Sequence, residues 1–281
     1  DVERSRGLGD VYKRQIRIAL PGASGRMGRM ITRAIAETEG FELVAASDHP
    51  SSPHLGSDTG ILNGLGESGV VIADNPDALI AAKPDVIIDF TTAGASVIHA
   101  DLAASAGLPM VIGTTGHDDD QVSRLRKASE KTAIVWCANT SVGVTMLADL
   151  VEQAGRALGD GWDIEIVETH HRHKIDAPSG TALALGEAAA RGRGVNLAEV
   201  SDHARHGITG VRDDGRIGFA VMRGGDVVGE HSLILYGEGE RVELSHRATD
   251  RMIFARGALR AARWASARPK GLYSMKDVLK G

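Results

Sequence analysis

Three histidines, an arginine and a lysine occupy consecutive positions 170–174, within the stretch VETHHRHKIDAPSGTALALG. The formal net charge of the chain is −5, so this cationic cluster does not belong to a generally basic surface. Ser179-Gly180-Thr181 follows and opens a segment of strong helix formers. Free N–H groups at a helix N-terminus suit a carboxylate or a phosphate, and the neighbouring imidazoles and amine can donate protons. The stretch therefore predicts a small anionic substrate and acid–base chemistry.

The backbone conformation of this cluster decides which side chains act together. On an extended backbone His170, Arg172 and Lys174 project to one side, and His171 and His173 to the other. His170 and Lys174 then face the same ligand, and either can be the proton donor. A metal site on His171 and His173 and a solvated basic loop are the alternatives. We favour the anion site because no cysteine or HExxH pattern accompanies the histidines.

A glycine-rich turn near the N-terminus predicts a second binding site. The segment IRIALPGASGRMGRM places Gly22, Gly25 and Gly28 between a predicted strand and a predicted helix. Glycines at such a turn let backbone N–H groups approach a pyrophosphate. Asp48 follows the next predicted strand, where a carboxylate can bind ribose hydroxyls. A turn that only allows close packing is the alternative, but this order of features favours a dinucleotide.

The residues around Asp48 bear on the choice of dinucleotide. A carboxylate accepts hydrogen bonds from ribose hydroxyls and repels a 2′-phosphate. His49 offsets that repulsion only while its ring is protonated, which is a minority state near neutral pH. We therefore expect NADH or NADPH to bind, with NADH preferred.

Composition excludes several classes of protein. The chain has 281 residues, of which 42% are hydrophobic and 25% charged, as in ordinary globular proteins. Its acidic balance argues against nucleic-acid binding, and no apolar run is long enough to cross a membrane. Cys137 is the only cysteine, so we expect a reducing compartment, the cytoplasm. Residues 1–15 are polar, unlike a secretory signal, and are interpreted as a non-native extension.

Apolar strands alternate with amphipathic helices up to residue 140, which predicts a parallel sheet covered on both faces. The predicted strands are 16–20, 41–47, 70–73, 85–90, 109–113 and 133–138. The predicted helices are 26–40, closed by Gly40, then 76–82, 94–106 and 119–130.

The pattern changes after Asn139, which predicts a second domain with a partly antiparallel sheet. The expected elements are a helix at 142–158, a strand at 162–169, a helix opening at Ser179, a loop at 193–215, strands at 216–223, 226–236 and 240–248, and a final helix at 250–265.

Five motifs together resemble one family. They are GASGRMG, IDFT at 88–91, VIGTTG at 111–116, ANTSVGV at 138–144 and HHRHKIDAPSGTALALGE at 170–187. In order and spacing the chain resembles the dihydrodipicolinate reductase family of lysine and diaminopimelate biosynthesis. The resemblance implies an α/β fold with a Rossmann-type parallel-sheet domain (16–140 and 251–281). It also implies an inserted α+β domain (141–250) with a mixed sheet, which binds substrate and forms a homotetramer.

The resemblance also implies roles for individual residues. His170 and Lys174 are the acid–base pair, and His171, Lys174, Ser179, Gly180 and Thr181 bind a small dicarboxylate. The implied cofactor-binding residues are Gly22, Ala23, Ser24, Gly25, Arg26, Met27, Asp48, His49, Phe90, Thr91, Gly113, Thr114, Thr115, Cys137, Ala138, Asn139 and Thr140. No metal is implied.

The implied reaction is hydride transfer from a nicotinamide to 4-hydroxy-tetrahydrodipicolinate, with loss of water. Another nicotinamide-dependent amino-acid dehydrogenase would share the cofactor half of the chain. A dinucleotide sensor without catalysis would share it too. Neither alternative explains why the HHRHK cluster is followed by PSGT.

Overall fold

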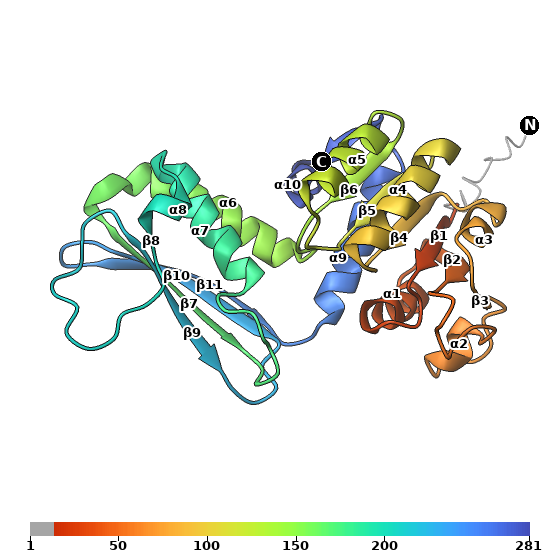
Figure 1. Cartoon of the computed structure of the whole chain (residues 1–281), viewed down its shortest axis with the longest axis horizontal. Helices are drawn as coiled ribbons and strands as arrows, with labels where there is room; N and C mark the ends of the chain where they lie inside the picture. The colour runs from red at the N-terminus through yellow and green to blue at the C-terminus, as the bar shows by residue number, and fades with distance from the viewer. Residues whose placement is uncertain (1–13) are drawn as a thin grey trace, which may run out of the picture.

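The computed structural model describes residues 14–281, which form two lobes, each built on its own sheet (Figure 1). The expected extension at 1–15 therefore lies outside the described residues except for Arg14 and Gln15. Arg14 forms an ion pair with Asp85, with 2.8 Å between nitrogen and oxygen. Helix α6 and the segment between β11 and α9 connect the lobes (Figure 1).

Seven parallel strands make the first sheet, in the order β12-β6-β5-β4-β1-β2-β3. The strands are β1 (Ile16–Pro21), β2 (Phe41–Ser47), β3 (Ile72–Ala73), β4 (Val86–Asp89), β5 (Met110–Ile112), β6 (Ala133–Trp136) and β12 (Gly271–Tyr273). The strand order reverses between β1 and β4. Loops that leave these two strands diverge and open a crevice at their carboxyl ends, as in Rossmann-type folds.

Helices cover both faces of this sheet, as predicted. They are α1 (Arg26–Glu37), α2 (Thr59–Leu62), α3 (Asp77–Ala81), α4 (Ala93–Ala106), α5 (Asp119–Ser129), α9 (Met252–Ala265) and α10 (Met275–Lys280). Alternate residues of β4 belong to hydrophobic clusters on opposite faces of the sheet. Ile88 is in the cluster that includes Ile31 of α1, and Ile87 is in the cluster that includes Val97 of α4. The apolar runs of these strands are therefore buried on both sides.

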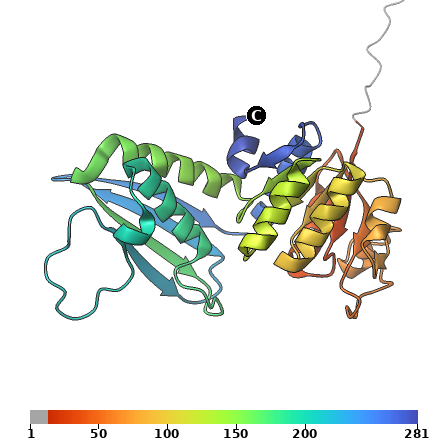
Figure 2. The same ribbon diagram turned by 45° about the horizontal axis from the view of Figure 1, so that its top comes forward.

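The second sheet has the order β11-β10-β7-β9-β8 and is mixed, because β10 runs antiparallel to both of its neighbours. Its strands are β7 (Asp163–His170), β8 (Ser201–Asp202), β9 (Ile217–Arg223), β10 (Gly229–Tyr236) and β11 (Arg241–Ala248). Helices α6 (Val142–Leu158), α7 (Gly180–Arg193) and α8 (Leu197–Val200) cover one face (Figure 2). Leu147, Ile166 and Leu185 belong to the core between these helices and the sheet.

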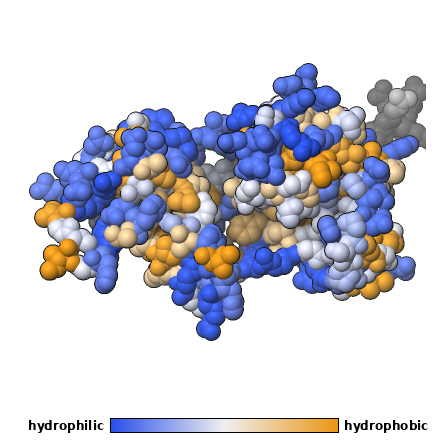
Figure 3. Space-filling model, viewed as in Figure 1, coloured by the Kyte–Doolittle hydropathy of each residue, from blue (hydrophilic) through white to orange (hydrophobic). Residues whose placement is uncertain are grey.

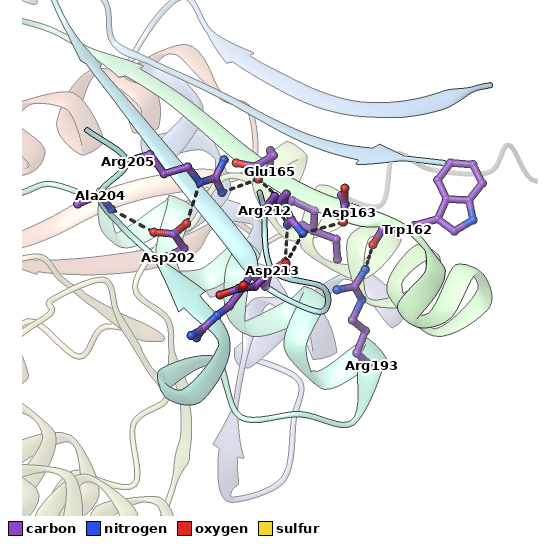
Figure 4. A network of polar contacts seen from close by, with 11 residues as sticks. Trp162, Asp163, Glu165, Arg193, Asp202, Ala204, Arg205, Arg212 and Asp213 are labelled. Atoms are coloured by element: carbon purple, nitrogen blue, oxygen red, sulfur yellow. Dashed lines mark hydrogen bonds and ion pairs between the residues drawn. The ribbon is translucent and has the colours of Figure 1, made fainter. Parts of the chain in front are cut away.

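Ion pairs hold the long segment between β8 and β9 against the second sheet (Figure 4). Arg212 contacts Asp163 at 2.7 Å and Glu165 at 3.0 Å, and Arg205 contacts the same Glu165 at 2.7 Å. Between these anchors Ile208 and Val211 are almost completely exposed.

Several predicted boundaries are wrong. The expected loop at 193–215 contains α8 and β8, and the helix at 250–265 is not final, because β12 and α10 follow it. These elements have two to six residues each, which is too short for a helical or strand-like hydrophobic period to show in the sequence. The first helix ends at Glu37 because Thr38 is already extended, and Gly40, with φ of +83°, turns the chain into β2 instead.

None of the helices in residues 14–281 is both long enough and apolar enough to span a membrane. On the face of the molecule shown in Figure 3, apolar residues form scattered patches among hydrophilic ones.

Candidate active site

Close backbone packing shapes the turn after β1. A Cβ on Gly28 would lie 2.2 Å from the carbonyl oxygen of Gly22, so α1 can approach the turn only with glycine there. Gly22 has φ of +69°, which also favours glycine. Gly25 is the N-cap of α1 and offers no side-chain cap. The first backbone N–H groups of α1 therefore have no capping side chain as acceptor, and they suit an anion.

A cavity of about 470 Å³ lies at the crevice between β1 and β4. From the predicted cofactor residues it is lined by Gly22, Ser24, Gly25, Asp48, His49, Phe90 and Thr91. The volume is in the range of small-molecule sites. The structure thus brings the glycine turn, the acid after β2 and the loop after β4 to one cavity.

Asp48 closes the glycine turn. One of its oxygens accepts hydrogen bonds from the amide (3.0 Å) and the hydroxyl of Ser24, and the other accepts from the His49 amide at 2.8 Å. A ribose hydroxyl that binds Asp48 has to share this carboxylate with Ser24.

Other predicted cofactor residues lie outside the lining of this cavity. Arg26 and Met27 line a neighbouring one, and Ala23 is buried. Gly113, where a Cβ would lie 2.1 Å from the Phe90 ring, lies directly against that side chain. The remaining predicted cofactor residues do not line the cavity at the β1–β4 crevice: Gly113, Thr114, Thr115, Cys137, Ala138, Asn139 and Thr140.

The segment after β6 connects the two lobes. The Asn139 side-chain amide donates to the Thr181 hydroxyl at 3.0 Å, which links a predicted cofactor residue to a predicted substrate residue. The Thr140 hydroxyl is buried and donates to the Phe254 carbonyl at 2.7 Å. Burial raises the pKa of the Cys137 thiol to about 12, so this thiol stays protonated at neutral pH.

In the second lobe a buried carboxylate, that of Glu168, organises the HHRHK region. One oxygen accepts from His170 Nδ1 at 2.6 Å and from Arg223 at 2.7 Å. The other accepts from the Ser179 amide at 2.9 Å and from Arg223 at 2.8 Å. In the sheet register His170 lies opposite Arg223, and Glu168 lies opposite His231. These strands therefore project the four side chains beside the N-terminus of α7.

These contacts set the protonation of Glu168. Burial alone would raise its pKa, but hydrogen bonds from Arg223, His170 and the Ser179 amide hold the pKa below the usual 4.5. The carboxylate is therefore ionised at neutral pH. Its stabilising contribution is present above pH 4.5 and is lost as pH falls through its lowered pKa.

The same contacts fix the tautomer of His170. Nδ1 carries the proton that it donates to Glu168, so Nε2 of the neutral ring is left as an acceptor. Burial lowers the pKa of His170 below 6.5, with smaller contributions from Lys174 and Arg223, and Glu168 offsets this only in part. Near neutral pH the ring is therefore a neutral imidazole whose free nitrogen points away from Glu168.

A second buried histidine supports the N-terminus of α7. The Ser179 hydroxyl accepts from the Ala182 amide at 3.1 Å and lies 3.0 Å from His231 Nε2. Burial lowers the pKa of His231 to about 4, so its ring is neutral and Nε2 can accept from the hydroxyl. The rings of His231 and His170 meet edge to face, with centroids 5.0 Å apart.

The backbone from 170 to 174 is not extended, so the alternation considered in the sequence does not apply there. Strand β7 ends at His170, and the Lys174 amide donates to the His171 carbonyl at 3.1 Å, which closes a turn. Arg223 also donates to the Asp176 carbonyl at 2.6 Å and so holds this turn against the sheet. Lys174 still lies near enough to lower the pKa of His170, and it pairs with Asp176 at 2.9 Å.

The rings of His171 and His173, the pair considered as metal ligands, have centroids 6.2 Å apart. Across residues 14–281 no group of three or more His, Cys, Asp or Glu side chains could hold a metal ion.

Several residues of the site were missed from the sequence. Glu168 could have been recognised from the sequence. It lies two residues before His170 in a predicted strand, and side chains two residues apart in a strand point to the same face of the sheet. Arg223 and His231 come from distant strands, and only the register of the second sheet places them here.

Two family models cover nearly the whole described chain. "Dihydrodipicolinate reductase, N-terminus" matches residues 16–140, and "Dihydrodipicolinate reductase, C-terminus" matches residues 143–279. The chain belongs to the dihydrodipicolinate reductase family.

Relatives in the family are similar over almost their full length. A protein named 4-hydroxy-tetrahydrodipicolinate reductase from Sinorhizobium medicae is 52% identical over 266 residues, which are 94% of this chain and 97% of that protein. A protein named 4-hydroxy-tetrahydrodipicolinate reductase 1 from Mesorhizobium japonicum is 54% identical over 263 residues, 93% of this chain and 96% of that protein.

A solved structure of the same family supports the fold. The dipicolinate-bound dihydrodipicolinate reductase from Paenisporosarcina sp. TG-14 is 27% identical, with a TM-score of 0.75. The match covers 94% of this chain and 99% of that chain. The parallel sheet and the second, mixed sheet of this chain thus belong to a fold that the family shares.

Glu168→Gln tests the central contact of the site. The change removes the negative charge from Arg223 and puts an amide where two acceptor oxygens were, and breaking such a buried pair costs about 3–5 kcal/mol of stability. Denaturant unfolding at neutral pH measures the loss. Glu37→Gln, in an exposed pair with Arg256 at 3.5 Å, is the matched control and should change stability by less than about 1 kcal/mol. Equal effects of the two substitutions would refute the importance of Glu168.

Proposed function

We propose that this protein reduces 4-hydroxy-tetrahydrodipicolinate to tetrahydrodipicolinate, with NADH or NADPH as reductant, in lysine and diaminopimelate biosynthesis. The observation that carries the proposal is the position of the His170 side chain. Its ring is fixed by Glu168, beside the N-terminus of α7, in a chain that is 52% identical to a reductase of that name over 94% of its length. An acid–base group next to an anion-binding helix end suits a dicarboxylate substrate.

The substrate carboxylates are bound, in this proposal, by two sets of groups. The N-terminus of α7, with the Gly180 and Thr181 amides and the Thr181 hydroxyl, holds one of them, and Ser179 supports that helix end. Lys174 neutralises the other, and His171 donates a hydrogen bond to it. Lys174 also stabilises charge that develops on the ring during reduction, because a cation placed beforehand needs no reorganisation.

His170 is the proton donor in this proposal. A dianionic substrate beside the ring raises the pKa of His170, and Nε2 takes up a proton from solvent. After water has left the 4-hydroxy compound, the bound nicotinamide would supply a hydride to C4 of the conjugated imine, with the displaced electron pair taken up at the ring nitrogen. His170 Nε2 gives that nitrogen its proton, and the resulting enamine tautomerises to the imine product by moving this proton from nitrogen to C5. Glu168 stabilises the imidazolium that precedes the transfer and keeps Nε2 directed at the substrate.

The cofactor site proposed is the cavity at the β1–β4 crevice and the adjoining segment after β6. Gly22 to Met27 bind the pyrophosphate through the exposed N–H groups of the turn and of α1. Asp48 binds the adenosine ribose beside His49. Phe90, Thr91 and Gly113 to Thr115 line the groove, and Cys137 to Thr140 approach the nicotinamide. Support comes from Asn139, which contacts the substrate-side Thr181.

The domain roles are also proposals. Residues 16–140 and 251–281 bind the dinucleotide, and residues 141–250 bind substrate and assemble four copies of the chain in the cytoplasm. Helices cover only one face of the second sheet (Figure 2). The anchored segment that carries exposed Ile208 and Val211 lies beside it, and such apolar side chains suit a contact with another copy.

A nicotinamide absorbance assay with freshly generated hydroxytetrahydrodipicolinate tests the function. We expect rapid oxidation by the wild-type protein and turnover lower by at least about a hundredfold in Lys174→Ala, because a charge-stabilising group is lost. Tight dinucleotide binding without oxidation in the wild type would instead favour a sensor. Near-normal turnover of Lys174→Ala would remove Lys174 from the mechanism, and a change in substrate KM alone would leave it a binding role.

Steady-state kinetics with both dinucleotides tests the preference for NADH. Asp48 should bind the free hydroxyls of NADH and repel the 2′-phosphate of NADPH, so we expect the higher kcat/KM with NADH. Asp48→Asn should narrow the difference, since it removes the repelling charge. An equal or higher kcat/KM with NADPH in the wild type would contradict the proposal.

A further inference from the structure

A second buried carboxylate, Asp89, ends strand β4 directly beneath the proposed cofactor loops. It has no exposed surface. One oxygen accepts from the Thr91 amide and hydroxyl, both at 2.8 Å, and from the Thr114 hydroxyl at 3.1 Å. The other accepts from His99 Nδ1 at 2.6 Å. The carboxylate thus joins the loops after β4 and β5 and helix α4.

These contacts fix the direction of two hydroxyl groups. The Thr91 and Thr114 hydroxyls both donate to the same Asp89 oxygen, so each directs its proton at that carboxylate. Each hydroxyl has one proton, and only lone pairs remain for a ligand. Thr91 lines the cavity at the crevice. This wall therefore offers acceptors, which match donor groups such as ribose hydroxyls and a carboxamide NH₂.

His99 completes the set of donors to Asp89. It also lines the cavity, and only 11% of its side chain is exposed. Joining the loops would not by itself require this carboxylate, because the Gly113 amide already donates to the Asp89 carbonyl at 2.9 Å. A buried carboxylate is costly unless it is hydrogen-bonded. His99 supplies the only bond of its second oxygen within the described residues.

We propose that Asp89 and His99 form a positioning pair that holds the Thr91 hydroxyl as an acceptor for a hydroxyl or amide group of the dinucleotide. The inference rests on the proposed dinucleotide site and adds its donor–acceptor pattern. His99 acts through Asp89, and Asp89 acts through Thr91. Without His99 one buried carboxylate oxygen lacks a donor, so the carboxylate loses the orientation in which its other oxygen accepts from the Thr91 hydroxyl.

The test is the dissociation constant of NADH, measured by nicotinamide fluorescence, in the full-length protein. His99→Leu should raise it about tenfold, the equivalent of roughly 1.4 kcal/mol. His99→Asn should restore binding, because its amide nitrogen can take the place of Nδ1. Thr91→Val, which removes the acceptor that lines the cavity without burying a charge, should weaken binding in the same direction even where His99→Leu does not fold.

His117→Leu is the matched control. His117 packs edge to face on Trp136 and bonds to the Ser96 hydroxyl at 2.8 Å, not to Asp89. It should lower the melting temperature and leave NADH binding within about twofold. An unchanged dissociation constant in His99→Leu or Thr91→Val, a failed rescue by His99→Asn, or an equal loss of binding in His117→Leu would overturn the proposed pair. A wild-type protein that binds neither NADH nor NADPH would instead refute the proposed dinucleotide site itself.

Discussion

Glu168 places a negative charge in the interior of the second lobe, and donors from three elements have to reach it. His170 comes from the same strand, Arg223 from β9 and the Ser179 amide from the N-terminus of α7. Because an ionised carboxylate is stable there only when it is fully hydrogen-bonded, the positions of these elements are coupled. The orientation of His170, the start of α7 and the path of the turn at 171–178 all depend on this one group.

The first lobe uses the same device. Asp89 ends a strand in the middle of the parallel sheet and collects donors from two loops and a helix, as Glu168 does in the mixed sheet. In each case a histidine Nδ1 lies 2.6 Å from a buried carboxylate oxygen. Asn139 and Thr181 meet where the lobes join, so the proposed sites for reductant and substrate are adjacent. Hydride transfer requires this proximity.

Long periodic segments made the parallel sheet, its covering helices and the second sheet predictable from sequence. The motifs at Gly22–Gly28 and His170–Thr181 indicated two candidate sites, because glycines at a turn and a run of cationic residues are recognisable without tertiary contacts. The turn after His170 was not predictable, since it depends on Arg223, a strand away. His231 and Arg223 join the site only through strand register, and β8, β12 and α10 are too short to show a period.

Nitrogen-15 NMR of the imidazole of His170, assigned against a His170→Gln variant, tests most directly whether Glu168 prepares this ring for proton transfer. Near neutral pH, above the lowered pKa of His170, the free protein should show a neutral ring with its proton on Nδ1. Adding dipicolinate, a dianion, should protonate both nitrogens at the same pH. A proton on Nε2 of the free neutral ring, or a ring that stays neutral with dipicolinate bound, would contradict the account.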